Sequence, residues 1–214
     1  MKVGIFGTGD VGRSLGRAFV ALGHDVKLGA REASNEKAVA WAKENGERAS
    51  AGTFADAAEF GELTVLATLG AANEAVLKAA GPERLAGKIL IDTTNPLVFR
   101  PGEPPGLAIS GNDSGGEQVQ RLASRALVVK AFNTVGNAHM FRPEFSGGPP
   151  DMFFCGNDEP AKNRVSSLLS DFGWNSVDLG GIQASRYLEA MCIVWVLYAM
   201  KRGGYDHAFK MLRK

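Results

Sequence analysis

The sequence of 214 residues contains little of the chemistry that marks several classes of protein. Its two cysteines, Cys155 and Cys192, lack the spacing of a metal site or a redox pair, so we expect buried, inert thiols in a reducing compartment. The three histidines lie far apart in the sequence, and we therefore expect no metal site. A net charge of +1 without a basic stripe argues against nucleic acid as a partner.

Long hydrophobic runs are also missing. The longest one, residues 190–200, is too short to cross a bilayer and follows Glu189, which predicts a packed helix and no membrane partner. The chain begins directly with a strand-like run instead of a charged-then-apolar leader, so we expect a cytoplasmic protein. The length suits one well-buried α/β domain with a small addition.

A glycine-rich turn directly after the first predicted strand is the most informative feature that is present. Gly7, Gly9 and Gly12 follow strand-like residues 2–6 with the spacing Gly-x-Gly-x-x-Gly. In a dinucleotide site the first glycine permits a tight turn, the second lets the backbone approach the pyrophosphate, and the third lets the next helix lie close to the strand. The free N–H groups at the start of that helix attract phosphate. We therefore expect cofactor contacts from Gly7, Thr8, Gly9, Asp10, Val11 and Gly12.

The residues after this turn provide the context that the motif needs. Apolar residues recur at helical spacing from Val11 to Leu22, and residues 26–29 have the pattern of a second strand. A strand, a glycine turn, a helix and a second strand therefore follow one another as in a β-α-β unit. A structural turn without a ligand is the alternative interpretation.

The end of the second predicted strand indicates which cofactor is bound. Sites that prefer NAD usually place an acidic residue there, whereas this chain has Gly29, Ala30 and Arg31. The planar cation of Arg31 suits the 2′-phosphate of NADP, with an ordinary exposed arginine as the alternative. Lys37 is a second candidate cation, and its alternative is an exposed position on the next helix.

The rest of the chain alternates between predicted helices and buried strands, which favours a Rossmann-type, doubly wound α/β fold with a mainly parallel sheet. We expect an NADP-binding domain over residues 1–178 and a C-terminal helical segment over residues 179–214. Residues 97–113 are the longest irregular segment and a candidate lid. Helices are predicted at 36–45, 54–60, 73–80, 114–125, from 158 onward and at 184–202, and strands at 63–68, 88–92, 127–130, 151–155 and 176–178.

The last predicted helix is more apolar than a solvated helix needs to be. Two interpretations remain open, packing against its own sheet and a homodimer interface, and both can hold together. Its apolar face is predicted to contain Tyr187, Leu188, Met191, Val194, Trp195 and Tyr198.

Four segments that follow predicted strands carry a resemblance to a known family. They are residues 68–71, 92–97, 130–135 and 178–189, and ligands of parallel sheets bind beyond such strand ends. Together with the glycine turn they resemble the NADPH-dependent reductases of the deazaflavin coenzyme F420, also called F420-dependent NADP oxidoreductases, over essentially the whole chain.

This resemblance implies direct hydride exchange between the nicotinamide of NADP(H) and a flat deazaflavin or flavin-like ring, with no catalytic acid or base. The second substrate would then be F420 or a flavin. Arg31 matches the family's 2′-phosphate arginine, while Ala30 stands where the family has a hydroxyl residue. The resemblance places the nicotinamide beside Thr68, Leu69, Asn95, Pro96, Asn133 and Val135.

Other functions remain open at this point. Residues 136–139 do not match the deazaflavin pocket of the family, and Phe99, Phe141 and Trp195 either line an aromatic platform or belong to the core. A small-substrate NADP dehydrogenase or imine reductase is a second possibility. Alcohol oxidation by such an enzyme would need a general base, for which Lys130 is the one candidate in a motif, although a structural role or a cofactor contact fits it better. A non-catalytic NADP(H) sensor is the third possibility. The acceptor, the direction of flux and the oligomeric state are left open.

Overall fold

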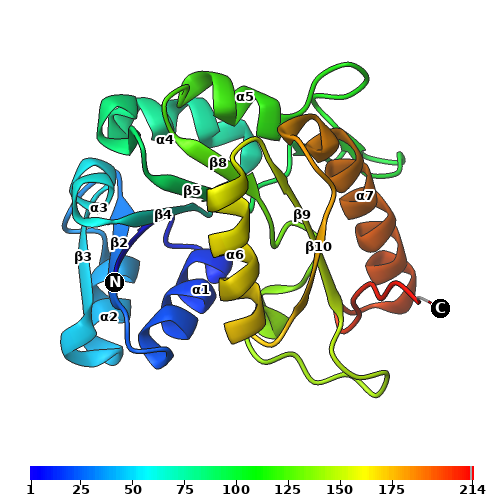
Figure 1. The fold of residues 1–214 in the computed structure, drawn as a ribbon, viewed down its shortest axis with the longest axis horizontal. Coiled ribbons are helices and arrows are strands. Elements are labelled where there is room, and N and C mark those ends of the chain that lie inside the picture. The colour runs from blue at the N-terminus through cyan, green and yellow to red at the C-terminus, as the bar shows by residue number, and fades with distance from the viewer. Residues whose placement is uncertain (213) are drawn as a thin grey trace.

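The computed structural model, which describes residues 1–212 and 214, contains an eight-stranded sheet between two layers of helices (Figure 1). The order of the strands is β10-β9-β8-β5-β4-β1-β2-β3, so the sheet is doubly wound as expected. Its strands are β1 (Lys2–Phe6), β2 (Asp25–Ala30), β3 (Ala49–Thr53), β4 (Leu63–Leu66), β5 (Ile89–Asp92), β8 (Leu127–Lys130), β9 (Asp151–Gly156) and β10 (Asn175–Asp178).

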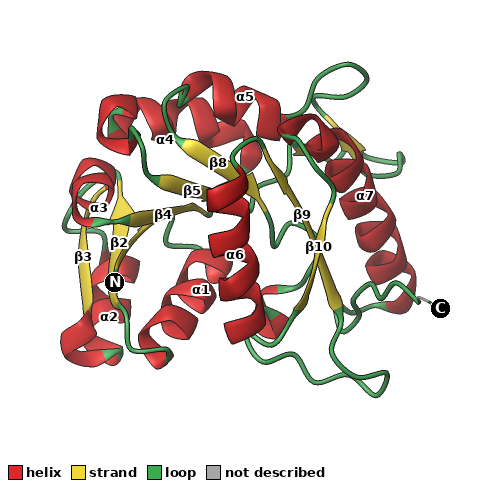
Figure 2. Cartoon of the chain, viewed as in Figure 1, coloured by secondary structure: helices red, strands yellow, loops and turns green. Residues whose placement is uncertain are grey.

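Helices cover both faces of this sheet because alternate side chains of each strand point to opposite faces. In β1, Val3 and Ile5 join the hydrophobic cluster of α1, α2 and α6, whereas Phe6 joins that of α3, α4, α5 and α7. Figure 2 shows the helices packed around the strands. The helices are α1 (Asp10–Ala21), α2 (Glu36–Glu44), α3 (Phe54–Phe60), α4 (Asn73–Ala80), α5 (Gly115–Leu122), α6 (Glu159–Asp171) and α7 (Ser185–Arg202).

Six neighbouring strands are parallel, and the strand order reverses at β1, where ligands of this fold bind. The last two strands differ, because β9 is antiparallel to β8 and β10 runs with β9. Residues 178–189 therefore follow a strand that runs opposite to β8, although the sheet as a whole is mainly parallel, as expected. The turn after β10 still lies near the carboxyl end of β8, because Cys155 pairs with Lys130 and Asp178 pairs with Phe154.

Three local predictions need correction. The edge strand β3 was missed because its residues Ala-Ser-Ala-Gly-Thr have weak strand propensity. The segment 97–113 is not wholly irregular, since β6 (Leu97–Val98) and β7 (Gly106–Leu107) form a short antiparallel hairpin within it. Helix α5 ends at Leu122, three residues before the predicted end. A lid role for residues 97–113 stays a prediction.

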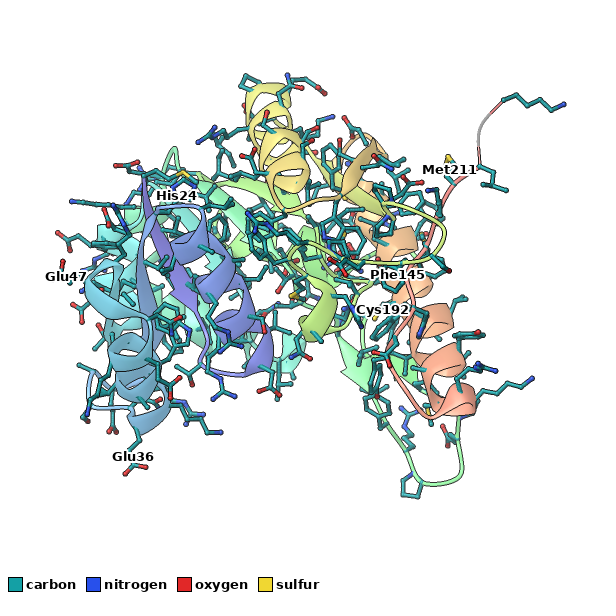
Figure 3. All side chains as sticks on the ribbon, turned by 90° about the horizontal axis from the view of Figure 1, so that it is seen from below. His24, Glu36, Glu47, Phe145, Cys192 and Met211 are labelled. Carbon is teal, nitrogen blue, oxygen red and sulfur yellow. The ribbon has the colours of Figure 1, made fainter. Side chains whose placement is uncertain are left out.

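Helix α7 buries only part of the face that the sequence predicts. Leu188, Cys192 and Trp195 are buried, whereas Tyr187 and Tyr198 are 70% and 50% exposed. In Figure 3, Cys192 lies on the side of α7 that faces the rest of the protein. The helix therefore packs on its own protein and still presents apolar residues at the surface. A homodimer and a domain boundary at residue 178 stay predictions.

Both cysteines are buried, and burial raises the pKa of the Cys155 and Cys192 thiols to about 12, so they are unreactive as expected. No helix in the described part of the chain has the length and apolar character that a membrane span requires. Among residues 1–212 and 214, no group of three or more His, Cys, Asp or Glu side chains is arranged to hold a metal ion.

Candidate functional site

The glycine turn has the geometry that its spacing predicts. Gly7 has a φ of +127°, and a Cβ atom there would overlap the carbonyl group of Ala67. A Cβ atom on Gly12 would overlap the carbonyl group of Gly7, so this glycine lets α1 lie against the strand end. Gly9 differs from both, because, apart from Gly9 and its two chain neighbours, no described residue has an atom within 4 Å of the place where its Cβ would be. The turn is therefore tight underneath and open at Gly9.

Helix α1 begins at this open side with its N-terminus uncapped. Gly9 is the N-cap residue, and no side chain of the described residues caps the first N–H groups. These groups carry the positive end of the helix dipole. The carboxylate of Asp10 lies in the first turn, but Arg13 binds it at 2.6 Å and offsets its charge. The arrangement suits an anion.

The two cations predicted to recognise the 2′-phosphate lie after β2, the strand beside β1. The N–H group of Gly7 donates to the carbonyl oxygen of Gly29 at 3.0 Å, which joins the end of β2 to the glycine turn. Arg31 follows two residues later, and Lys37 lies in the first turn of α2. Both side chains are exposed, and neither forms an ion pair with another described residue.

Buried hydrogen bonds join the loops that follow β4 and β5. The hydroxyl of Thr68 donates to Asn73 Oδ1 at 3.1 Å, and Asn73 Nδ2 donates to Thr94 Oγ1 at 2.7 Å. The Thr94 hydroxyl in turn donates to Asp92 Oδ1 at 2.7 Å. Asn73, Thr94 and Asp92 are all buried, so these bonds fix the two loops relative to each other.

A fully buried lysine ends this chain of bonds. The ammonium of Lys130 contacts Asp92 Oδ2 at 2.9 Å, Thr94 O at 2.7 Å and Glu189 Oε1 at 3.1 Å, which uses all three of its donors. Burial by itself would lower the pKa of Lys130, but the charges of Asp92 and Glu189 outweigh burial and raise the pKa. Lys130 is therefore a charged structural residue and not a free base.

Glu189 connects this cluster to two helices. Its carboxylate, on α7, accepts hydrogen bonds from the N–H groups of Gly115 and Gly116, both at 3.0 Å. It thus binds the N-terminus of α5, where a capping box between Ser114 and Glu117 is only partly formed. Ser114 accepts from the Glu117 N–H, while the Glu117 carboxylate bonds to the Ser114 hydroxyl and to Arg186 instead of the Ser114 backbone.

Two of the predicted nicotinamide residues bind each other. Asn133 Nδ2 donates to Asn95 Oδ1 at 3.0 Å and to Leu188 O at 2.9 Å, and Asn95 Nδ2 donates to Asn133 O at 2.9 Å. These bonds join the loops after β5 and β8 to α7. Asn133 Oδ1 is buried and has no partner among the described residues.

The other residues predicted at this edge differ in exposure. Leu69 is 81% exposed, Thr68 is half-buried and Pro96 is buried. Val135 belongs to the hydrophobic cluster that contains α1, so it supports the loop from the core side. A pocket of about 160 Å³ lies beside these loops, and its lining includes Gly70, Pro96, Val98, Ile109, Gln118 and Leu122.

The aromatic residues proposed as a platform have separate positions. Phe99 is 64% exposed near the hairpin, and Phe141 packs edge-on against Phe172 in the core. Trp195 is stacked with Tyr205 and with His207, which come from the C-terminal residues. The three residues therefore do not form one platform in this structure.

Sequence reasoning missed Asn73 and Arg13 as parts of the site, and it gave no role to Thr94. Asn73 begins α4 and is recognisable only through its two buried partners, since asparagine at a helix start is ordinary. Thr94 stands inside the segment 92–97 that carries the family resemblance, but its contacts depend on the approach of α4. Arg13 could have been named from the sequence, because it stands one residue after the last glycine of the motif.

Comparison with known proteins agrees with this geometry. The family described as NADP oxidoreductase coenzyme F420-dependent matches residues 2–96. A candidate F420-dependent NADP-reductase from Arthrobacter sp. FB24, known from its crystal structure, has 40% sequence identity to this chain. The match covers 100% of both chains, and the two structures superpose with a TM-score of 0.93. The chain belongs to the F420-dependent NADP reductase family.

This reductase has more distant relatives. The F420-dependent NADP reductase of Methanothermobacter marburgensis is 27% identical over 203 residues, covering 88% of both chains. Rat metalloreductase STEAP3 is 29% identical over 200 residues, which are 89% of this chain and 36% of that protein, so the chain spans about a third of its length. A reductive aminase from Aspergillus terreus, solved with bound NADPH, shares the fold. The two chains superpose with a TM-score of 0.67 at 24% sequence identity, and the match covers 94% of this chain and 62% of the aminase chain. The chain is an NADP(H)-dependent oxidoreductase.

Proposed function

We propose that this enzyme exchanges a hydride between NADP(H) and a flat deazaflavin ring of the F420 type or a related flavin. The observation that supports this most is the state of the charged groups beside the loops after β4, β5 and β8. Asp92, Lys130 and Glu189 are buried and bound to one another, so in the described chain they are not available as proton donors or acceptors. Direct hydride exchange needs position and polarity rather than a base.

The residues of the glycine turn fit the phosphates of the cofactor. The space above Gly9 is open, and the uncapped N-terminus of α1 offers N–H groups to an anion. We assign the pyrophosphate to residues 7–12. Asp10 would not repel it strongly, because Arg13 already binds its carboxylate.

The exposed cations after β2 fit the 2′-phosphate. Arg31 has the planar fork that binds phosphate oxygens in pairs, and Lys37 adds a second positive charge. Ala30, which stands in place of the family's hydroxyl residue, is buried at the end of β2 and offers no hydrogen bond from its side chain. We assign the preference for NADP over NAD mainly to Arg31.

The nicotinamide would lie against the loops after β4, β5 and β8, and it would supply or accept the hydride when bound. Thr68, Asn95 and Asn133 offer polar groups there, while the exposed Leu69 offers an apolar surface to a flat ring. Pro96 and Val135 shape these loops from within. The hydrogen bonds between the loops hold the polar groups in place before any ligand arrives.

A dehydrogenase of small hydroxy compounds is less well supported. Oxidation of an alcohol needs a positioned base, and Lys130, the candidate named from the sequence, has all three of its donors bound. Reductive aminase and imine reductase structures share the fold at 24% identity or less, which carries no argument about substrate.

Stopped-flow oxidation of NADPH tests the proposal. The purified chain is mixed with NADPH and then with F420, FMN, FAD or a quinone, and we expect rapid oxidation with F420 or a flavin. A variant that cannot bind the nucleotide, Gly9→Val, should show none. Tight NADPH binding without oxidation by any of these acceptors would instead support an NADP(H) sensor.

A further inference from the structure

The buried carboxylate of Asp92 fixes the direction of every hydrogen bond between itself and Thr68. Asp92 is paired with the ammonium of Lys130, so its Oδ1 atom can only accept. The Thr94 hydroxyl, 2.7 Å away, must therefore donate its single proton to Asp92. Having no second proton, Thr94 Oγ1 must accept from the neighbouring Asn73, which places Asn73 Nδ2 on that side, at 2.7 Å.

The same logic fixes the outer end of this chain. With Nδ2 turned toward Thr94, Asn73 presents its Oδ1 atom to the Thr68 hydroxyl at 3.1 Å, and Thr68 must donate. The one hydroxyl proton of Thr68 is then used inside the protein. Thr68 is half-buried at the carboxyl end of β4, so its Oγ1 atom offers only lone pairs outward.

We infer that Thr68 is held as a hydrogen-bond acceptor of fixed polarity and that it recognises the amide N–H group of the nicotinamide carboxamide. This inference rests on the proposed function, which places the nicotinamide beside Thr68. Hydroxyl groups of ribose can donate or accept and do not require such a fixed partner. An amide N–H group can only donate, and it requires one. The imide N–H of a deazaflavin or flavin has the same chemistry and is the other possible source.

The hydroxyl and the carboxamide can be removed independently to test this recognition. Calorimetry gives the Kd of NADP⁺ and of its 3-acetylpyridine analogue, which keeps the carbonyl group but has no N–H donor. We expect the natural chain to bind NADP⁺ about 3- to 10-fold more tightly, the range of one neutral hydrogen bond. The ratio of the two Kd values should fall to about 1 in Thr68→Val, because the variant has no hydroxyl to accept a hydrogen bond from the carboxamide. Thr68→Ser should keep it.

A second pair of variants tests the fixed direction without touching Thr68. Thr94→Val removes the hydroxyl that orients Asn73, so Asn73 can turn over and Thr68 can rotate its proton outward. The ratio should then fall, whereas Thr94→Ser should preserve it. The compound 2′,5′-ADP lacks the nicotinamide and should bind all variants equally, which separates loss of recognition from loss of folding.

Each result decides the matter. An unchanged ratio in Thr68→Val overturns the inference. If methylation of the acceptor's imide nitrogen raises its KM in the natural chain but not in Thr68→Val, the donor belongs to the acceptor ring and the carboxamide assignment is wrong. Absence of binding by both NADP⁺ and 2′,5′-ADP overturns the proposed function as well. Normal nucleotide binding with the expected ratios but no hydride transfer removes only the proposed acceptor.

Discussion

The two halves of the candidate site are built in different ways. Around β1 and β2 the site consists of backbone and exposed charge, namely an open turn at Gly9, the start of α1 without a side-chain cap, and Arg31, which pairs with no other described residue. Around β5 and β8 it consists of buried polar side chains that bind one another, with Lys130 among them. The first half suits a charged ligand, while the second holds its own polar side chains in fixed positions.

The difference has a physical reason. Phosphates carry full charges that attract cations and helix ends over some distance, so moderate precision is sufficient. Hydride exchange depends on the separation and alignment of two rings, and an error of about 1 Å is costly. A buried network of satisfied hydrogen bonds is one way to give loops that rigidity.

The largest effect is expected in the first half. Gly9→Val should abolish binding of NADP(H), because a side chain would fill the open space that the pyrophosphate needs. Since no described residue beyond its chain neighbours lies within 4 Å of that Cβ position, the variant should fold normally. Calorimetry and thermal unfolding check this together. Gly12→Ala is the contrasting variant, because its methyl group would overlap Gly7 and lower the stability of the fold. If Gly9→Val keeps its affinity for NADP(H), the assignment of the pyrophosphate to the glycine turn is wrong.

In the second half, Lys130→Met should act on stability. It leaves the carboxylates of Asp92 and Glu189 buried without their cation, which is expected to cost about 3–5 kcal/mol of unfolding free energy. Urea denaturation measures the loss. The surface pair of Lys78 with Glu74 gives the control, since Lys78→Met should change little. Equal effects of the two variants would contradict the buried network.

A smaller effect is expected for Arg31→Ala, which should weaken binding of NADPH by about 10- to 100-fold, the range of hydrogen bonds to a charged group. Binding of NADH should hardly change, because NADH has no 2′-phosphate. Parallel titrations of both nucleotides give the comparison. Lys37→Ala shows whether the second cation takes part, and equal losses for NADPH and NADH would refute the role of Arg31.

The smallest effect concerns the ion pair of Glu117 with Arg186. Hydrogen bonds from Arg186 lower the pKa of Glu117 below its usual value, although burial opposes this. Because the folded-state pKa is lowered, the pair stabilises the protein fully above the usual glutamate pKa and loses this contribution as the pH falls through the folded-state pKa. Glu117→Gln should therefore lower Tm at neutral pH and show a smaller further loss in acid. If Tm falls with decreasing pH by the same amount in Glu117→Gln and in the natural chain, the ion pair does not contribute to stability.

Much of the fold could be predicted because it depends on local patterns. The glycine turn, the buried strands and the bounds of α3 and α4 follow from spacing and hydrophobicity over a few residues. The edge strand β3 could not be found, since its small residues become a strand only by pairing with β2. The reversed direction of β9 was equally hidden, because a strand's own sequence does not say which way its neighbour runs.

The site divides in the same way. The roles proposed for Gly9 and Arg31 could be named from the sequence because they depend on a few adjacent residues. The partners of Thr68, Asn133 and Lys130 could not be named, since they come from α4, from the loop after β5 and from α7.

The sequence by itself determined the doubly wound α/β fold, the glycine turn and the family, because these depend on short-range spacing and on residues that stand in order. Only the tertiary structure decided that Lys130 is a structural cation, that α7 supports the loops of the site, and which way the Thr68 hydroxyl donates. Those properties depend on which buried donors and acceptors meet, and hydrogen bonds in the interior are satisfied by partners far apart in the chain.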